Sequence, residues 1–266
     1  MFDVANVSVL YDDGTSEGKL AVDKVSLTVE DGEFVSIIGP SGCGKSTLLH
    51  CMGGLLKPSN GTVSYDNTLV VDTSPEQYAF VFQDYSLFPW KKVLDNVAIG
   101  LRFAGVPRTE RQARAREQLQ MVGLSEYADA YPAQLSGGMQ QRVAVARALA
   151  MDPQVMLMDE PFGALDEQTR RQLGDSMAKV LTEMKKSVVM VTHSLDEAVF
   201  WSDRVYVLGR SPASVKLVLD VDEERPRRLS FISSPKFAAL RARLFDELEG
   251  TASDGQGSPH AMAGGL

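Results

Sequence analysis

Residues 39–46 carry the most restrictive pattern in the sequence, a glycine-rich loop that ends in Lys-Ser. They fit the pattern G-x-x-x-x-G-K-[ST], in which backbone N–H groups and one lysine surround a chain of phosphates. A continuous apolar run, Phe34–Ile38, precedes the loop and predicts a strand buried on both faces. Residues 46–56 predict a helix whose positive N-terminal end faces the phosphates. The first expectation is therefore an α/β phosphate-binding fold.

Each residue type in this loop has a chemical reason. Glycines let backbone amides turn toward one centre, Lys45 reaches the β- and γ-phosphates, and the Ser46 hydroxyl can ligate Mg²⁺. Thr47 adds a hydrogen bond on the α-phosphate side. Cys43 is interpreted as a small tolerated residue, with a low-pKa thiol at the helix N-terminus as the alternative. The predicted phosphate-binding residues are Gly39, Pro40, Ser41, Gly42, Cys43, Gly44, Lys45, Ser46 and Thr47.

The bulk composition limits the possible partners and compartment. A formal net charge of −8 and a pI of about 5.0 make the chain a poor ligand for nucleic acid or anionic lipid. No apolar run approaches the roughly 18–20 residues that span a bilayer, and the N-terminus has no signal-peptide pattern. The two cysteines do not form a secreted disulfide framework. We expect a cytosolic protein that meets membranes only through a protein partner.

Periodicity along the chain divides it into a core and an inserted lobe. Early strands are predicted at residues 2–10, 22–30 and 61–71, with 31–32 as a hairpin-type turn, and later strands at 155–158, 187–191 and 205–208. Core helices are predicted at residues 140–150, 167–184, 195–200 and 235–248, the last with Ser234 as N-cap. Residues 90–135 predict instead a helical lobe, with helices at 93–101 and 108–122. Strands that alternate with helices indicate a mostly parallel sheet. The glycine-rich residues 250–266 are expected to be disordered.

Two acids follow the apolar run at 155–158. Asp159 is placed to hold Mg²⁺ through water, and Glu160 to polarise an attacking water. A strand end with two solvated acids is the alternative, and it is disfavoured because a phosphate loop lies upstream.

Residues 135–142, Leu-Ser-Gly-Gly-Met-Gln-Gln-Arg, place a second anion site at a helix start. In a single chain this would be an ordinary helix cap. The segment resembles the signature motif of ABC-type ATPases. The resemblance covers roughly residues 2–250 and implies the ABC ATPase fold, with a mostly parallel core, an N-terminal antiparallel β subdomain and an inserted helical subdomain at about 90–140. It also implies a head-to-tail dimer in which two ATP molecules lie between the phosphate loop of one chain and Ser136, Gly137, Gly138 and Gln140 of the other. Residues 1–250 then form one domain and 251–266 a disordered tail.

The same resemblance assigns roles to four further residues. Gln83 matches the glutamine that ligates Mg²⁺ and links the site to the membrane partner. Asp166 matches the loop along the dimer interface, and His193 the histidine that contacts the γ-phosphate. Tyr11 matches the aromatic residue that stacks on adenine, with Phe2 as the alternative.

Residues 88–97 and 159–166 are similar to the nitrate/sulfonate/taurine branch of bacterial importers, as are residues 224–228 and 235–248. This branch implies a separate transmembrane permease, a solute-binding protein and a place at the cytoplasmic face of the membrane, without nucleic acid. Trp90 is interpreted as a permease contact, with plain core as the alternative.

Three other functions remain as alternatives. Chromosome-associated ABC ATPases carry long coiled coils between the two motifs, and no heptads occur here. Translation-type factors usually have two cassettes and basic patches. A regulator that binds ATP without hydrolysis is disfavoured by Glu160 and His193.

Overall fold

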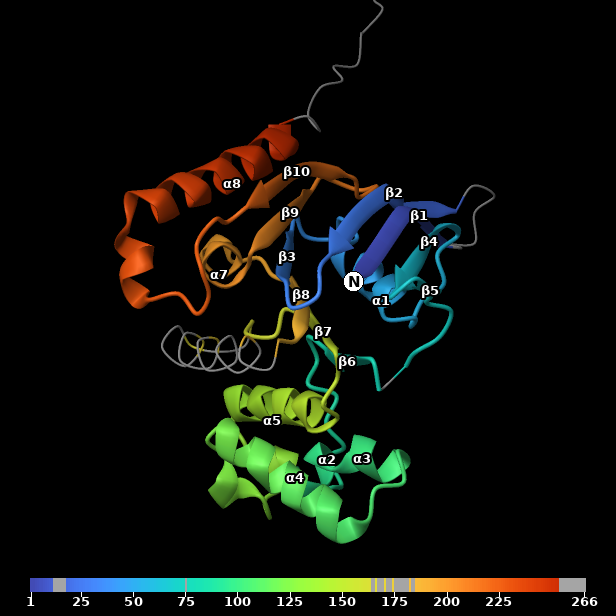
Figure 1. Ribbon diagram of the computed structural model, residues 1–266, viewed down its shortest axis with the longest axis vertical. Coiled ribbons are helices and arrows are strands. Elements are labelled where there is room, and N and C mark those ends of the chain that lie inside the picture. The colour runs from blue at the N-terminus through green and yellow to red at the C-terminus, as the bar shows by residue number, and fades with distance from the viewer. Residues whose placement is uncertain are drawn as a thin grey trace, which may run out of the picture.

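A computed structural model describes residues 1–11, 18–74, 76–163, 166, 170, 174, 182 and 185–253. Within these residues, the strands form two sheets, one with the order β2-β1-β4-β5 and one with the order β10-β9-β3-β8-β7-β6. Figure 1 shows the two sheets in the upper body and a group of helices, α2 to α5, extending below it.

The four-stranded sheet is antiparallel and comprises β1 (Phe2–Tyr11), β2 (Lys19–Val29), β4 (Asn60–Tyr65) and β5 (Thr68–Leu69). The prediction of one strand over residues 61–71 was wrong, because Asp66 and Asn67 turn the chain between β4 and β5. Both residues have left-handed backbone angles, with φ of 49° and 60°, which Asp and Asn tolerate better than most residues. The turn at residues 31–32 leads from β2 into the other sheet and therefore closes no hairpin.

The six-stranded sheet carries the functional residues. Its strands are β3 (Phe34–Ile38), β6 (Tyr78–Val81), β7 (Val155–Asp159), β8 (Ser187–Val191), β9 (Arg204–Leu208) and β10 (Val215–Asp220). All neighbours are parallel except the edge pair β9 and β10. The carboxyl ends of β3, β6, β7 and β8 therefore meet at one edge. Neither β6 nor β10 was predicted.

Both faces of this sheet are buried, as the apolar runs predicted. Val155 and Leu157 of β7 pack into a core shared with the four-stranded sheet and with α1 (Lys45–Met52). Met156 and Met158 pack into the opposite core with α7 (Leu195–Trp201) and α8 (Pro235–Ser253). Strands covered on both sides hold their register firmly, so the loops after them have a fixed base.

Helix boundaries differ from the predictions where glycine intervenes. Helix α1 ends at Met52, earlier than predicted, because Gly53 and Gly54 follow it. A Cβ at Gly53 would lie 2.0 Å from the Phe80 ring, and Gly54 has φ of 72°. Ser234 caps α8 by accepting a hydrogen bond from Phe237 N, as predicted. Helix α8 continues past Leu248 to Ser253, into the segment predicted to be disordered. Residues 254–266 lie outside the described residues.

The helical group consists of α2 (Val93–Val97), α3 (Ile99–Phe103), α4 (Arg108–Met121) and α5 (Gly137–Ala150). The predicted helix at 93–101 is in fact two short helices joined at Ala98. Helix α5 packs against both α4 and β6, and so connects this group to the large sheet. Most of the predicted helix 167–184 lies outside the described residues.

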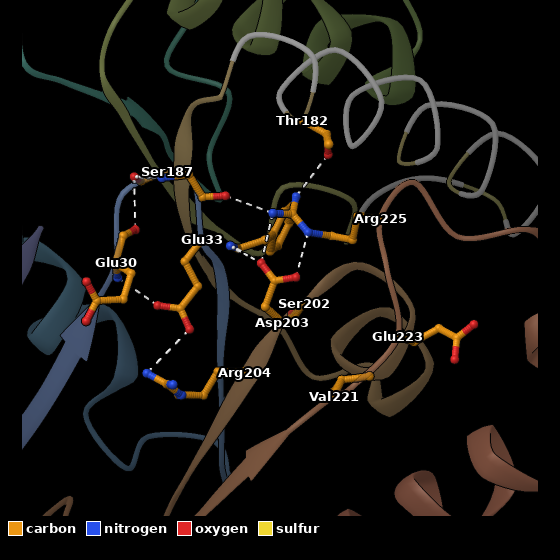
Figure 2. A network of polar contacts seen from close by, with 12 residues as sticks. Glu30, Glu33, Thr182, Ser187, Ser202, Asp203, Arg204, Val221, Glu223 and Arg225 are labelled. Atoms are coloured by element: carbon orange, nitrogen blue, oxygen red, sulfur yellow. Dashed lines mark hydrogen bonds and ion pairs between the residues drawn. The ribbon is translucent and has the colours of Figure 1, made fainter.

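A network of polar contacts ties the segment before α8 to the start of β3 (Figure 2). The Arg225 guanidinium donates to Asp203 Oδ1 and to the Gly32 carbonyl, each at 2.8 Å, and to Thr182 Oγ1 at 3.0 Å. Asp203 Oδ2 in turn accepts from Phe34 N at 2.8 Å. Charge-assisted bonds of this kind hold a loop in place without secondary structure.

Among the described residues, none of the helices combines the length and apolar character needed to cross a bilayer.

Candidate functional site

A hollow of about 450 Å³ lies where the carboxyl ends of the parallel strands meet. It is lined by Tyr11, Lys19, Ala21, Ser41, Gly42, Gly44, Lys45, Ser46, Thr47, Gln83, Glu160, His193 and Ser211. These residues come from the phosphate loop, from β1 and β2, and from the segments that follow β6, β7, β8 and β9. The topology thus gathers residues up to 200 positions apart at one place.

The phosphate loop needs glycine at defined positions. Gly42 and Gly44 have φ of 72° and 113°, in the left-handed region that favours glycine. A Cβ on Gly44 would also lie 2.7 Å from the Ala21 carbonyl oxygen. Lys45 Nζ donates to the carbonyls of Gly39 and Pro40 at 2.9 Å each, and the side chain is buried. The loop therefore curves around a fixed positive charge at the N-terminus of α1.

Cys43 belongs to the core and not to the hollow. Its side chain is buried among apolar residues of the core beneath the four-stranded sheet. Burial raises the pKa of the thiol, and the nearby Lys45 charge offsets this only in part. The alternative of a low-pKa thiol at this helix N-terminus is therefore not supported. Gly39 and Pro40 do not line the hollow either; their carbonyls hold Lys45.

Tyr11 lies at the rim of the hollow, with its hydroxyl 3.1 Å from Thr47 Oγ1. The ring is partly exposed, as a platform for a planar ligand must be. Phe2, the alternative, is buried in the core, where its ring packs against Tyr65 and Tyr78. The structure therefore favours Tyr11.

Glu160 has polar contacts from three separate segments. Its Oε1 lies 2.6 Å from His193 Nε2, and Gln83 Nε2 donates to its Oε2 over 3.4 Å. Its backbone N–H continues the sheet by donating to Val191 O at 2.9 Å, while its φ of 47° turns the chain. The Glu160 carbonyl accepts from Gln141 Nε2 at 3.3 Å. The carboxylate is thus held at the edge of the hollow in a single orientation.

Asp159 is buried, and its Oδ1 has no hydrogen-bond partner among the described residues. A buried carboxylate oxygen without a donor is costly unless a cation or its water meets it. No group of three or more His, Cys, Asp or Glu side chains capable of holding a metal occurs in the described part of the chain. Mg²⁺ does not need such a cage, because it keeps waters and binds through one carboxylate plus phosphates. Ser46 and Gln83 line the hollow, whereas Asp159 does not, and all three carry oxygen donors of the kind that Mg²⁺ prefers.

The segment at 136–140 is ordered but lies apart from the hollow. Ser136 Oγ accepts from Met139 N at 3.3 Å and caps α5. Gln140 Nε2 donates to the carbonyls of Pro132 and Leu135. Neither these residues nor Gly137, Gly138 and Asp166 line the hollow. Within one chain, residues 136–140 therefore do not contribute to the hollow of the phosphate loop.

Four residues at the site were not predicted from the sequence. Gln141 lies on the buried face of α5, and only its amphipathic position could have indicated it. Lys19 and Ala21 line the hollow from β2, and Ser211 lines it from the loop before the unpredicted strand β10. A sequence pattern carries no signal for them, because the topology alone brings them to the hollow.

Comparisons with known proteins agree with this geometry. The sequence profile of the ABC transporter family matches residues 22–163. An uncharacterized ABC transporter ATP-binding protein of Methanocaldococcus jannaschii is 48% identical over 92% of this chain and 90% of its own length. The taurine import ATP-binding protein TauB of Rhizobium johnstonii is 44% identical over 92% of this chain and 95% of its own. The nitrate import ATP-binding protein NrtC of Synechococcus elongatus is 44% identical, over 86% of this chain but 35% of its own length.

Among solved structures, the fold is similar to that of the ATP-binding cassette MJ0796, described as a dimer in a post-hydrolysis state bound to ADP and Pi. The TM-score is 0.77 at 37% identity, over 84% of this chain and all of the other. This likeness extends the sequence match to the arrangement of the sheets and helices.

Proposed function

The chain belongs to the ABC transporter family, and we propose that it is the ATP-hydrolysing subunit of an importer for a small solute. It has the ABC ATPase fold, and ATP hydrolysis is the activity of that fold. The observation that carries the proposal is the contact of His193 and Gln83 with the Glu160 carboxylate, at the edge of the phosphate-loop hollow. A chain that bound ATP without hydrolysing it would not need these three side chains in contact.

The proposed cassette spans residues 1–250, with residues 90–140 as the inserted helical subdomain. The phosphate loop, from Gly39 to Thr47, holds the triphosphate through its backbone amides, Lys45 and the α1 N-terminus. Tyr11 covers the adenine ring from the rim. A second copy of the chain supplies Ser136, Gly137, Gly138 and Gln140 to the γ-phosphate, and Asp166 lies along the interface. Within one chain, residues 136–140 do not line the hollow of the phosphate loop, which supports this composite arrangement.

Hydrolysis then requires little covalent chemistry from the protein. Glu160 accepts a hydrogen bond from the attacking water and fixes its orientation, while His193 holds the carboxylate and faces the γ-phosphate. Positioning and charge stabilisation account for most of the rate in phosphoryl transfer. Loss of the γ-phosphate removes the group that both chains bind. ATP binds more tightly to the closed dimer than to the separated chains, and it thereby favours the closed dimer.

Mg²⁺ is part of the proposal, with Ser46 and Gln83 as ligands and Asp159 bound through water. The unpartnered Oδ1 of Asp159 supports this assignment. When bound, the ion would neutralise charge on the phosphate oxygens.

The proposed membrane partner is a transmembrane permease, which places the chain at the cytoplasmic face of the membrane. Trp90, shortly before α2, and Phe103, at the end of α3, are 70% and 80% exposed, and large exposed apolar side chains often mark protein contacts. The exposure of Trp90 argues against its role as core. A solute-binding protein would deliver the solute outside.

The solute is proposed to be a small anion or zwitterion of the nitrate, sulfonate or taurine type. TauB is named as a taurine import ATP-binding protein and NrtC as a nitrate import ATP-binding protein, and both names support this class. The test is ATP-dependent uptake by proteoliposomes that contain the candidate permease and this chain. Uptake that Lys45→Ala abolishes would support the function. Equal uptake with and without the chain would refute it. A non-transport ABC ATPase is the second candidate, and ATP hydrolysis without any permease binding would favour it.

A further inference from the structure

The loop that carries His193 is held from behind by a chain of hydrogen bonds. Thr192 Oγ1 donates to Glu197 Oε2 at 2.5 Å and accepts from Ser194 N at 3.1 Å. Ser194 Oγ in turn accepts from Glu197 N at 3.2 Å. The residues on both sides of His193 are therefore tied to Glu197.

Glu197 does more than an ordinary helix cap requires. The pattern Ser-x-x-Glu at 194–197 predicts a capping box, in which the glutamate accepts from the cap residue's own N–H. Here the Ser194 N–H goes to Thr192 Oγ1, and the glutamate reaches past it to the Thr192 hydroxyl. Both Thr192 and Glu197 are buried. A buried carboxylate is retained only where donors or a cation compensate its lost hydration.

A cation from another segment provides part of that compensation. Arg170 Nε lies 3.7 Å from Glu197 Oε1. Arg170 is in the segment that follows β7, the strand before Glu160, and its backbone N–H donates to Asp166 O. A hollow of about 210 Å³ separates the two segments, lined by Glu160, Gly163, Arg170, Thr192, His193, Ser194 and Glu197. Glu197 thus contacts the segment after Glu160 and the segment that carries His193.

We propose that Glu197 is a positioning residue for ATP hydrolysis, which fixes His193 against Glu160 through Thr192 and Arg170. This rests on the proposed function, since it takes Glu160 and His193 as the hydrolytic pair. Glu197 does not line the hollow of the phosphate loop, although it lines the smaller hollow together with Glu160. It acts through the His193 backbone, and displacement of a reacting group by about 1 Å can cost a hundredfold in rate.

The first test compares Glu197→Gln with Asp196→Asn in steady-state ATP hydrolysis. Glu197→Gln keeps the size of the side chain but removes the charge that faces Thr192 and Arg170. Its kcat should fall roughly tenfold or more, with KM for ATP within about twofold, because the phosphate loop is untouched. Asp196 lies in the same turn but is exposed and pairs with Arg241 at 2.6 Å. Asp196→Asn likewise removes one negative charge from the first turn of α7 and should leave kcat unchanged.

The second test is a double-mutant cycle with His193→Ala. If Glu197 acts through His193, Glu197→Gln should cost nothing further in that background. Thr192→Ser, which keeps the hydroxyl, should lose less rate than Thr192→Val, and this pair decides the matter if Glu197 variants fold poorly.

Three results would overturn the inference. The first is a double mutant whose kcat falls by the product of the two single-mutant factors. The others are a Glu197→Gln variant with raised KM and unchanged kcat, or equal kcat for Glu197→Gln and Asp196→Asn. Absence of hydrolysis by the unmodified chain under MgATP would instead overturn the proposed function, and this inference with it.

Discussion

His193 Nε2 lies 2.6 Å from Glu160 Oε1, although the two residues follow different strands. Strands β7 and β8 are parallel neighbours in register, with Asp159 opposite Val191, so the residues just beyond them meet. The left-handed φ of Glu160, at 47°, is a strained conformation for a non-glycine residue. Such strain persists where the surrounding contacts impose it, and here the Val191 carbonyl, Gln141 and His193 do so.

We expect His193→Ala to lower kcat by roughly a hundredfold to a thousandfold, the range typical for loss of one positioned polar group in a hydrolytic site. Binding of ATP should change little, because the phosphate loop does not depend on His193. Steady-state hydrolysis and ATP titration measure both. The control is His50→Ala in α1, which removes a histidine that contacts Phe80 and Phe82 and does not line the hollow. A variant at His193 as active as that control would contradict the assignment.

Asp159→Asn should separate stability from metal binding. The buried Oδ1 has no partner in the described residues, so removing the charge should leave the melting temperature of the ligand-free protein unchanged or raise it. The stabilisation that MgATP adds over ATP with EDTA should shrink markedly, because a water-bound cation loses its carboxylate. Thermal melts in the two mixtures test this. A large loss of stability without ligand, with the magnesium-dependent shift intact, would mean that Asp159 is structural.

The buried thiol of Cys51 should make the stability of the protein depend on pH in the alkaline range. Burial raises the pKa of this thiol from 9.0 to about 11 in the folded protein. Between these values the unfolded chain releases the proton first, so the free energy of unfolding falls as pH rises from about 9 to 11. This one group accounts for about 2–3 kcal/mol over that window. Denaturant titrations at pH 8, 9.5 and 11 should show a shallower decline for Cys51→Ala than for the unmodified chain. Parallel declines would show that the thiol does not contribute.

The network around Arg225 should contribute measurably to stability. The side chain is largely buried and makes three hydrogen bonds to separate segments, so Arg225→Ala should cost about 3 kcal/mol, as expected for an unpaired, partly buried Asp203. The control is Arg241→Ala, which breaks an exposed pair with Asp196 and should cost less than about 1 kcal/mol. Urea denaturation of both variants compares them directly. Equal costs would mean that the network is dispensable.

Much of the architecture followed from local patterns in the sequence. The apolar run Phe34–Ile38 and the loop after it predicted β3, the turn and α1, because a strand buried on both faces has a distinct composition. Asp159, Glu160 and His193 were placed correctly at strand ends for the same reason. The pattern of the phosphate loop was recognisable locally, since Gly42 and Gly44 are required by its own backbone angles.

Other features depend on contacts between distant segments. Strand β6 has only four residues, which is too short for a clear periodic pattern. Strand β10 is an edge strand, and its apolar and polar residues do not differ enough in burial to mark it in the sequence. Glu197 was not among the predicted functional residues, and only its contacts with Thr192 and Arg170 in the folded chain reveal it. The choice of Tyr11 over Phe2 likewise required knowing which of the two side chains is buried, and the alternating pattern of β1 alone does not settle that.

If two copies of the chain close around ATP, Glu160→Gln should accumulate as that dimer. The measurement is the mass by light scattering in MgATP and in MgADP, with nucleotide binding verified in both. Slow hydrolysis should trap the closed state, so we expect a dimer in MgATP and a monomer in MgADP. Addition of Ser136→Arg should abolish the dimer while ATP still binds, because the bulky charge occupies the second anion site. Equal mass in the two nucleotides with ATP bound, or a dimer that Ser136→Arg leaves intact, would contradict the composite site.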